Sequence, residues 1–347
     1  MRKLLGMFPV KTVLAVDGGA SKVDVALVDV EGNLRTAIRR RGRFNFGLGS
    51  NGSLAGLAGA IGAAQSSAVA TLGVFCLAGA DLPIDDRRIA AEIEGQMWTR
   101  RSVVRNDTFA VLRAGTDRKW GVAVVCGTGM NCAGVGPDGR SVRFPSFGEL
   151  SGDRAHGGGW LGRSALGAAI RARDGRGPRT LLEEMVPARF GMSRPTAVME
   201  AVYVGSLDRA RLNEVAPVVF RAAAAGDAVA QDLIDQMTEE IVVTANAAIR
   251  RLRLASRDVH VVLGGGVLRA ASDGLIARIA AGIRELAPRA VILRLEAPPV
   301  LGAALIGFDL LRASPEARVR LRQSLTHKEL GGQGQRRGKV RPGHRKR

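Results

Sequence analysis

Two stretches of the chain, about a hundred residues apart, carry the same succession of apolar and polar positions. In each, an apolar run meets a glycine-bearing turn, a second run with alternating apolar residues follows, and a hairpin turn leads to a third run. Alternation with a period of two is typical of β-strands. The predicted strands are Thr12–Val16, Lys22–Asp29 and Leu34–Ile38, and then Gly121–Val125, Met130–Val135 and Ser141–Phe144. The recurrence indicates a duplicated unit.

After each of these meanders, the pattern predicts helices and further strands. Helices are predicted at Ser53–Gln65, Arg87–Glu94, Thr108–Ala114, Leu161–Arg173, Asn213–Ala225, Ala228–Leu252, Gly274–Leu286 and Val300–Leu311. Strands are predicted at Thr71–Ala78, Ser102–Arg105, Val259–Leu263 and Ala290–Leu295. Residues 177–208 are predicted to be an irregular, proline-bearing insertion. We therefore expect an α/β protein with domains at 1–117 and 118–312, a linker near Gly115–Trp120 and a tail at 313–347.

The composition fits two domains with sizeable cores. The chain has 347 residues, of which 46% are hydrophobic but only 4% aromatic, so the cores must consist of Ala, Val, Leu and Ile. Three cysteines, Cys76, Cys126 and Cys132, make neither a disulfide framework nor a zinc site. No segment approaches the roughly 18 uncharged apolar residues of a membrane span. We expect a soluble, cytoplasmic protein that does not bind membranes.

The net charge of +19 is concentrated near the C-terminus. Residues 318–347 contain eleven Lys and Arg and one acid, so 11 − 1 = 10 of the 19 positive charges lie there. This stretch is rich in glycine and has few apolar residues after Leu330, which predicts a disordered tail. The composition favours a solvated tail over a nucleic-acid site, with only non-specific contacts to polyanions.

The glycine turns do not match the common phosphate-binding motifs. No run has the spacing of a P-loop, and a dinucleotide fingerprint needs a helix after the turn, where a strand is predicted here. A strand–turn–strand hairpin with bare glycines can still bring backbone amides to an anion. Ser21, Lys22, Thr128 and Asn131 would add donors. An ordinary tight hairpin is the alternative for either turn alone, but two such turns and a third at Gly264–Gly266 favour a polyphosphate site.

Five motifs in a fixed order resemble a known family. They are Asp17-Gly18-Gly19-Ala20-Ser21-Lys22, Asn106-Asp107, Cys126-Gly127-Thr128-Gly129-Met130-Asn131, Gly152-Asp153 and Leu263-Gly264-Gly265-Gly266. The chain resembles, over about residues 12 to 312, the N-acetylglucosamine kinase branch of the acetate-and-sugar-kinase/Hsp70/actin superfamily, also called BadF/BadG/BcrA/BcrD ATPases. The resemblance implies two ribonuclease-H-like (actin-like ATPase) domains, each a mixed sheet with flanking helices, with ATP, Mg²⁺ and a sugar bound in the cleft between them.

The resemblance also implies roles for individual residues. Asp107 would be the general base, and Asp17 would lie near the magnesium. The first phosphate site would comprise Gly18, Gly19, Ser21 and Lys22, the second Gly127, Thr128 and Gly129, and the adenosine loop Gly264, Gly265 and Gly266. The sugar would be held by Asn45, Asn131 and Asp153.

Elementary chemistry agrees with the role of Asp107. Phosphoryl transfer requires positioning, charge stabilisation and one carboxylate that orients the attacking hydroxyl. Asp17 and Asp107 each follow a predicted strand, on the edge where open α/β sheets bind ligands. Helix capping is the alternative role for Asp107 and remains equally open for Asp153. Arg105 and Arg154 beside these acids are either phosphate ligands or ion-pair partners.

The chain departs from the family pattern where the sugar should bind. The family usually has Gly-Asp-Glu-Gly-Ser, whereas this chain has Gly152-Asp153-Arg154-Ala155-His156 followed by three glycines, and Met130 replaces a small hydroxyl residue. We therefore expect a kinase for an amino sugar, with a larger amino sugar or a muropeptide fragment still open as substrate. The alternatives are a sugar or nucleotide sensor and a partner-activating ATPase with a shared iron–sulfur cluster, although Cys126 and Cys132 fit small buried hydrophobes better. A homodimer is compatible with either role.

Overall fold

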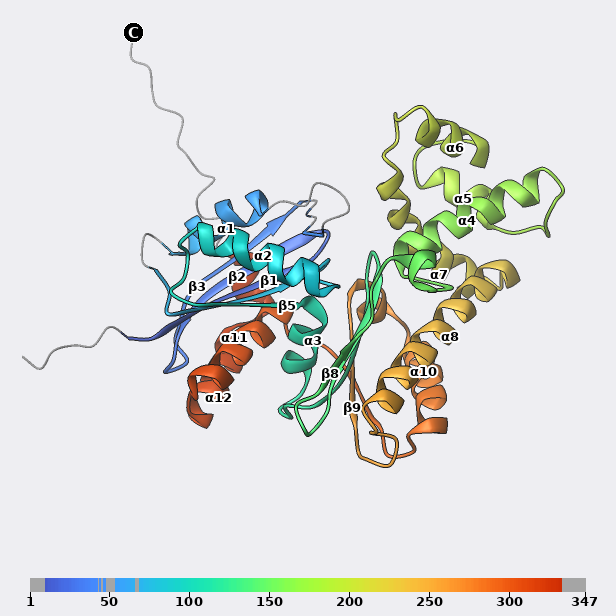
Figure 1. Cartoon of the computed structure of the whole chain (residues 1–347). Helices are drawn as coiled ribbons and strands as arrows, with labels where there is room; N and C mark the ends of the chain where they lie inside the picture. Colours follow the sequence, from blue (N-terminus) through green and yellow to red (C-terminus); the bar gives the residue numbers. More distant parts are fainter. Residues whose placement is uncertain (1–9, 43, 45, 48–53, 66–68, 333–347) are drawn as a thin grey trace, which may run out of the picture. The chain divides into compact units, whose positions relative to one another are not determined.

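The computed structural model describes residues 10–42, 44, 46–47, 54–65 and 69–332. The chain forms two compact units, one of Met1–Lys119 with Leu295–Arg347 and the other of Trp120–Arg294. Each unit contains one five-stranded mixed sheet with flanking helices (Figure 1). The predicted fold class is therefore confirmed.

The sheet of the first unit has the strand order β3-β2-β1-β4-β5. Its strands are β1 (Thr12–Gly18), β2 (Lys22–Asp29), β3 (Leu34–Arg41), β4 (Leu72–Leu77) and β5 (Ser102–Asn106). The first three form an antiparallel meander, and β4 and β5 continue the sheet in parallel with β1. The carboxyl ends of β1, β4 and β5 therefore lie on one edge.

Both faces of this sheet are buried, which explains its nearly continuous apolar strands. Successive side chains of a strand point to opposite faces. Val13 and Ala15 accordingly belong to one core, while Leu14 and Val16 belong to another. Helices α1 (Ala55–Gln65) and α2 (Pro83–Gly95) cover one face, and α3 (Asp107–Gly115), α11 (Pro299–Leu311) and α12 (Pro315–Ser324) cover the other (Figure 1).

The second unit repeats the topology of the first. Its strand order is β10-β9-β6-β7-β8, with an antiparallel meander followed by two parallel strands. The strands are β6 (Gly121–Cys126), β7 (Met130–Val135), β8 (Ser141–Arg143), β9 (His260–Gly264) and β10 (Val291–Arg294). The matching order of strands in the two sheets agrees with the predicted duplication.

Helices of the second unit form one large core with its sheet. They are α4 (Gly158–Arg173), α5 (Leu182–Ala188), α6 (Pro195–Tyr203), α7 (Ala216–Ala224), α8 (Ala228–Arg251), α9 (Gly266–Ala270) and α10 (Asp273–Leu286). The insertion predicted to be irregular at 177–208 thus contains two helices. The prediction was wrong there because Pro195 begins α6, where proline is tolerated, and Pro187 lies in the last turn of α5.

The division of the chain differs from the predicted one near its C-terminal end. Residues 295–312 were predicted to belong to the second domain, but α11 packs in the core of the first unit. Its apolar side chains, among them Val300, Leu305 and Phe308, cover the sheet face that carries Val13 and Val74. The prediction followed the order of the chain, whereas the packing joins segments almost 200 residues apart.

The disordered tail predicted at 313–347 is contradicted over its first part. Helix α12 and the short α13 (His327–Gly332) follow α11, and Ser314 caps α12 by accepting a hydrogen bond from the amide of Ala317. The side chains buried against the core of the first unit are Ala317, Leu321, Leu325 and Leu330. Residues 333–347 lie outside the described part of the chain.

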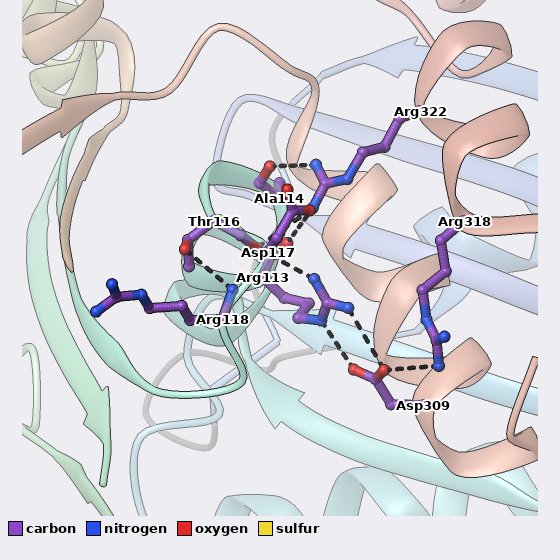
Figure 2. A network of polar contacts seen from close by, with 8 residues as sticks. All are labelled: Arg113, Ala114, Thr116, Asp117, Arg118, Asp309, Arg318 and Arg322. Carbon is purple, nitrogen blue, oxygen red and sulfur yellow. Dashed lines mark hydrogen bonds and ion pairs between the residues drawn. The ribbon is translucent and has the colours of Figure 1, made fainter. Parts of the chain in front are cut away.

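Arginines of α12 hold the carboxyl end of α3 (Figure 2). Arg322 donates hydrogen bonds to the carbonyl oxygens of Ala114 at 2.9 Å and Thr116 at 3.2 Å. Asp309 of α11 accepts from Arg113 at 2.8 Å and from Arg318 at 3.2 Å. Since the last carbonyls of a helix lack partners within the helix, Arg322 provides a cap for α3.

Candidate functional site

Three aspartates gather at the carboxyl edge of the first sheet. Asp17 lies near the end of β1, Asp107 begins α3 directly after β5, and Asp81 follows β4 in the turn before α2. The strands β1, β4 and β5 are parallel neighbours, so their ends meet at this edge. Asp81 was not predicted, because it lies four positions beyond the last residue of β4 and its place at the edge depends on the turn between them.

Asp17 is a buried carboxyl beside one cation. Its side chain is almost inaccessible, and the Nζ of Lys22 lies 3.6 Å from its Oδ2. Burial raises the pKa of Asp17 to about 6, although Lys22 acts in the opposite direction. A buried carboxyl with this raised pKa is a group whose ionised form would be stabilised by an additional cation.

Lys22 is held in place by a buried network. Its Nζ donates to Asp24 Oδ2 at 2.7 Å, and Arg39 donates to both oxygens of Asp24, at 2.6 and 2.7 Å. Burial opposes the ionisation of Asp24, but the hydrogen bonds from Arg39 and Lys22 outweigh it and lower the pKa of Asp24. Lys22 is thus positioned beside Asp17 while part of its side chain stays exposed.

Asp107 occupies the first position of α3 and is half-buried. Desolvation raises its pKa to about 7, with further contributions from the negative charges of Asp17 and Asp81. The capping role is filled by its neighbour Asn106, which accepts a hydrogen bond from the amide of Thr108 at 3.0 Å. The carboxylate of Asp107 is therefore not needed as the helix cap.

The first glycine turn is shaped mainly by packing. The amide of Gly19 donates to the carbonyl of Lys22 at 2.9 Å and closes the turn. A side chain on Gly18 would meet Leu77 at 2.5 Å and Phe46 at 2.8 Å. Ala20 and Ser21 at the tip are exposed. Donors to a ligand would therefore come from the tip and Lys22, while Gly18 leaves room for the core.

The second and third glycine turns come together in the second unit. The carbonyls of Gly127 and Thr128 accept hydrogen bonds from the amides of Gly158 and Gly159, at 2.8 and 2.9 Å. Gly265 has φ +92°, and a side chain on it would come within 2.8 Å of the backbone nitrogen of Cys126. The close approach of these backbones requires glycine. The structure thus joins Gly127–Gly129, the start of α4 and Gly264–Gly266 into one glycine-rich surface.

The third turn differs from the first two in being followed by a helix, α9, rather than a strand. This helix was not predicted, since its five residues are too few to show a period. Thr128, Gly129 and Gly266 are exposed, so the surface is open to a ligand.

Of the three residues predicted to bind the sugar, the structure describes two. Asn131 lies at the start of β7 beside the second turn, where its Oδ1 accepts from the amide of Cys132 at 2.7 Å. Asp153 accepts from Ser151 at 2.8 Å, after a short 3₁₀ segment. Both are partly exposed, whereas Asn45 lies outside the described residues.

Residues that replace the usual family pattern have partners of their own. His156 contacts Arg163 at 3.2 Å, and burial together with the charge of Arg163 lowers the pKa of the imidazole. Arg154 pairs with Glu239 at 3.8 Å on the surface. Arg105 lies 6.0 Å from the ring centre of Phe109.

The three cysteines are free and buried. Burial raises the pKa of Cys126 to about 12, and it raises those of Cys76 and Cys132 as well. Buried thiols of this kind behave as small apolar residues rather than as ligands of an exposed cluster. Across the described ranges, no three His, Cys, Asp or Glu side chains are arranged to hold a metal ion. Of the helices in the same ranges, none is both long and apolar enough to cross a membrane.

A sequence model of the BadF/BadG/BcrA/BcrD ATPase family matches residues 14–307. The chain belongs to this family. Its match includes both sheets and every glycine turn described above. It ends within α11, before α12 and α13.

Two relatives of this BadF/BadG/BcrA/BcrD chain have curated names. The N-acetylmuramic acid/N-acetylglucosamine kinase of Clostridium acetobutylicum is 27% identical over 191 residues, which are 55% of this chain and 62% of that protein. The N-acetyl-D-glucosamine kinase of Dictyostelium discoideum is 26% identical over 212 residues, or 59% of this chain and 65% of that protein. The chain thus matches less than two thirds of the length of either relative.

Solved structures share the fold. A Chromobacterium violaceum protein, named for a proposed N-acetylglucosamine kinase activity, has a TM-score of 0.63 at 24% identity, with 86% of this chain and 99% of that chain covered. A ROK family glucokinase from Streptomyces griseus, solved with glucose and AMPPNP, has a TM-score of 0.55 at 16% identity, with 85% and 98% covered. At these identities the likeness concerns the fold alone.

Proposed function

We propose that the chain is an ATP-dependent kinase that transfers a phosphoryl group to a hydroxyl of an amino sugar, with Asp107 as the general base. The observation that carries the proposal is the carboxylate of Asp107, partly buried at the sheet edge beside Asp17, with a pKa raised to about 7. A general base is most effective when its pKa lies near the working pH. The names of the two curated relatives support an amino sugar as acceptor.

In the proposed reaction, Asp107 accepts a hydrogen bond from the attacking hydroxyl of the sugar and takes its proton. The sugar oxygen forms a bond to the γ-phosphorus of ATP while the bond from that phosphorus to the β,γ-bridging oxygen breaks, and ADP leaves with that oxygen. The start of α3 holds this carboxylate, and the positive end of the helix dipole stabilises its ionised form. Asn131 and Asp153 would orient the sugar through hydrogen bonds. The role of Asn45 in sugar binding remains a hypothesis from the resemblance alone.

The residues at the sheet edge fit a magnesium ion that arrives with ATP. Mg²⁺ keeps several waters and takes one or two protein carboxylates beside the phosphates. Asp17 offers one such carboxylate, in agreement with the absence of a three-ligand cluster among the described residues. When bound, the ion would neutralise charge that develops on the phosphates. Lys22, Ser21 and the backbone of Gly18 and Gly19 would form the first phosphate site.

The glycine-rich surface of the second unit would bind the rest of the nucleotide. Gly127, Thr128 and Gly129 would contact phosphates through their exposed backbone, and Gly264, Gly265 and Gly266 would lie against the adenosine. Close approach of a ligand to backbone amides requires positions without side chains. The exposure of Thr128, Gly129 and Gly266 supports this assignment.

The proposal is tested by measuring ADP release with ATP, Mg²⁺ and a panel of hexoses and amino sugars, including N-acetylglucosamine and N-acetylmuramic acid. We expect one amino sugar to stimulate turnover. Asp107→Asn should lower kcat by about 10²- to 10⁴-fold and leave the KM for ATP nearly unchanged. Asp273→Asn is the matched control, because Asp273 also occupies the first position of a helix but is fully exposed.

Two outcomes would contradict the proposal. If ATP binds but no sugar stimulates turnover, a sensor or a partner-activating ATPase becomes the better interpretation. If a sugar is phosphorylated and Asp107→Asn retains full kcat, the enzyme is a kinase but its base is another group.

A further inference from the structure

Asp81 is a buried carboxylate that the proposed reaction does not use. Only 6% of its surface is exposed, and it lies between β4 and α2, at the same sheet edge as Asp107. Its Oδ1 accepts a hydrogen bond from Asn106 Nδ2 at 2.8 Å. Burying a carboxylate is costly unless it is well paired, and the hydrogen bond from Asn106, the last residue of β5, is one of the contacts that pair Asp81.

Asn106 connects Asp81 to the start of α3. Its side chain is fully buried, and its Oδ1 accepts from the amide of Thr108 at 3.0 Å and from Thr108 Oγ1 at 2.6 Å. Both ends of the amide group are thus used. Asn106 precedes Asp107 and Thr108 follows it, so the backbone of Asp107 is held from either side.

The carboxylate of Asp81 determines which way the amide of Asn106 points. An asparagine side chain can turn over and exchange its oxygen and nitrogen. An ionised carboxylate only accepts hydrogen bonds, so Nδ2 must face Asp81 and Oδ1 must face Thr108. A helix cap alone would need only the oxygen, which Asp or Ser supply equally well. The bond to Asp81 is therefore an additional constraint on the start of α3.

The opposite end of α3 is fixed as well. Arg322 and the Arg113–Asp309 pair hold its last turn (Figure 2). A helix of nine residues held at its carboxyl end has little freedom except at its first turn. At the first turn, Asn106 is the side chain that binds the backbone beside Asp107.

We propose that Asp81 is a positioning residue for Asp107 and acts through the side chain of Asn106. This inference rests on the proposed kinase function, since it assigns a partner to the proposed base. Asp81 does not touch the substrate in this scheme. Asp81 determines the orientation of the Asp107 side chain at the sheet edge.

The experiment exchanges the two partners. The Asn106→Asp variant keeps a good helix cap, but it loses the amide group that donates to Asp81 and places two carboxylates next to each other. We expect kcat to fall about 10²-fold, with the KM for ATP unchanged. Asp81→Asn keeps an acceptor but loses the orienting charge, and we expect a loss of about tenfold. The double variant D81N/N106D restores one donor facing one carboxylate, and its kcat should return to within about tenfold of the wild type.

A second readout does not depend on activity. Hydrogen exchange of the peptide amides at the start of α3 should speed up in Asn106→Asp and slow again in the double variant. Asp273→Asn should change neither readout. If the double variant is no better than Asn106→Asp in kcat and in exchange, the positioning role is refuted. If the wild type phosphorylates no sugar, the kinase proposal fails separately, and the exchange pattern still decides whether Asp81 orders the start of α3.

Discussion

Helices α3 and α11 approach each other through a glycine, and replacing it should separate them. A methyl group on Gly302 would lie 2.7 Å from the carbonyl carbon of Ala110 and 2.8 Å from the amide nitrogen of Ala114, and closer still to the carbonyl oxygen of Ala110. Ordinary contact begins at 3.4 Å, so the contact with the Ala110 carbonyl carbon alone requires the helices to part by at least 0.7 Å. The clash is with backbone on the opposite helix, which cannot rotate away as a side chain could.

The net effect of Gly302→Ala combines two opposing contributions. Alanine favours a helix over glycine by about 1 kcal/mol, whereas overpacking of this kind costs up to about 3 kcal/mol. We expect a net loss of about 1–2 kcal/mol in the free energy of unfolding. For a unit of this size, the thermal midpoint should fall by about 2–8 °C.

Gly62→Ala is the matched control for this prediction. Gly62 also lies inside a helix of the first unit, but a methyl group there would meet nothing within 4 Å. It should therefore gain about 0.5–1 kcal/mol of stability. Calorimetry and urea unfolding of both variants measure the difference. A Gly302→Ala protein as stable as the control variant would refute the close helix contact.

Two further perturbations test other parts of the structure. Because burial raises the pKa of Asp107 to about 7 from 3.8, the folded state keeps a proton that the unfolded chain releases. The stabilisation from this proton is complete below about pH 4 and is lost as the pH rises to about 7. In thermal scans without nucleotide, the Asp107→Asn variant should therefore unfold at least about 2 °C above the wild type at pH 8, and at nearly the wild-type temperature at pH 4. Equal shifts of the unfolding temperature at both pH values would contradict the raised pKa. Truncation after Ala313 removes three buried leucines and should lower the free energy of unfolding of the first unit by at least about 3 kcal/mol, measured by urea unfolding. Truncation after Gly332 should weaken only the binding of polyanions, measured by retention on heparin. A stable protein ending at residue 313 would show that α12 and α13 contribute nothing to the core.

Much of the fold and part of the site follow from local sequence. Alternating apolar residues predicted the two meanders, because every second side chain of a strand points to the same face of the sheet. Asp17 and Asp107 were found because each follows such a strand. Asp81 was missed because Ala78, Gly79 and Ala80 separate it from β4, so its position depends on a turn rather than on a period.

The remaining features depend on packing between distant segments. Helix α11 was predicted at nearly its observed bounds, but its membership of the first unit is decided by contacts with β1 and β4. Ala317 and Leu321 in α12 and Leu325 directly after it are buried and lie four positions apart, but arginines between them gave the segment the composition of a disordered tail. Arg318 and Arg322 are in fact used to bind Asp309 and the end of α3.

The split of the first unit into two segments has a consequence for synthesis on the ribosome. Its five strands are complete at Asn106, but the helix that covers one of their faces begins only at Pro299, which is 299 − 106 = 193 residues later. At a translation rate of about 5–20 residues per second, α11 is synthesised roughly 10–40 s after the last strand of this sheet. During that interval, Val13, Ala15 and Val74 present an apolar surface that chaperones can recognise. The unit that begins the chain is therefore the last to finish folding.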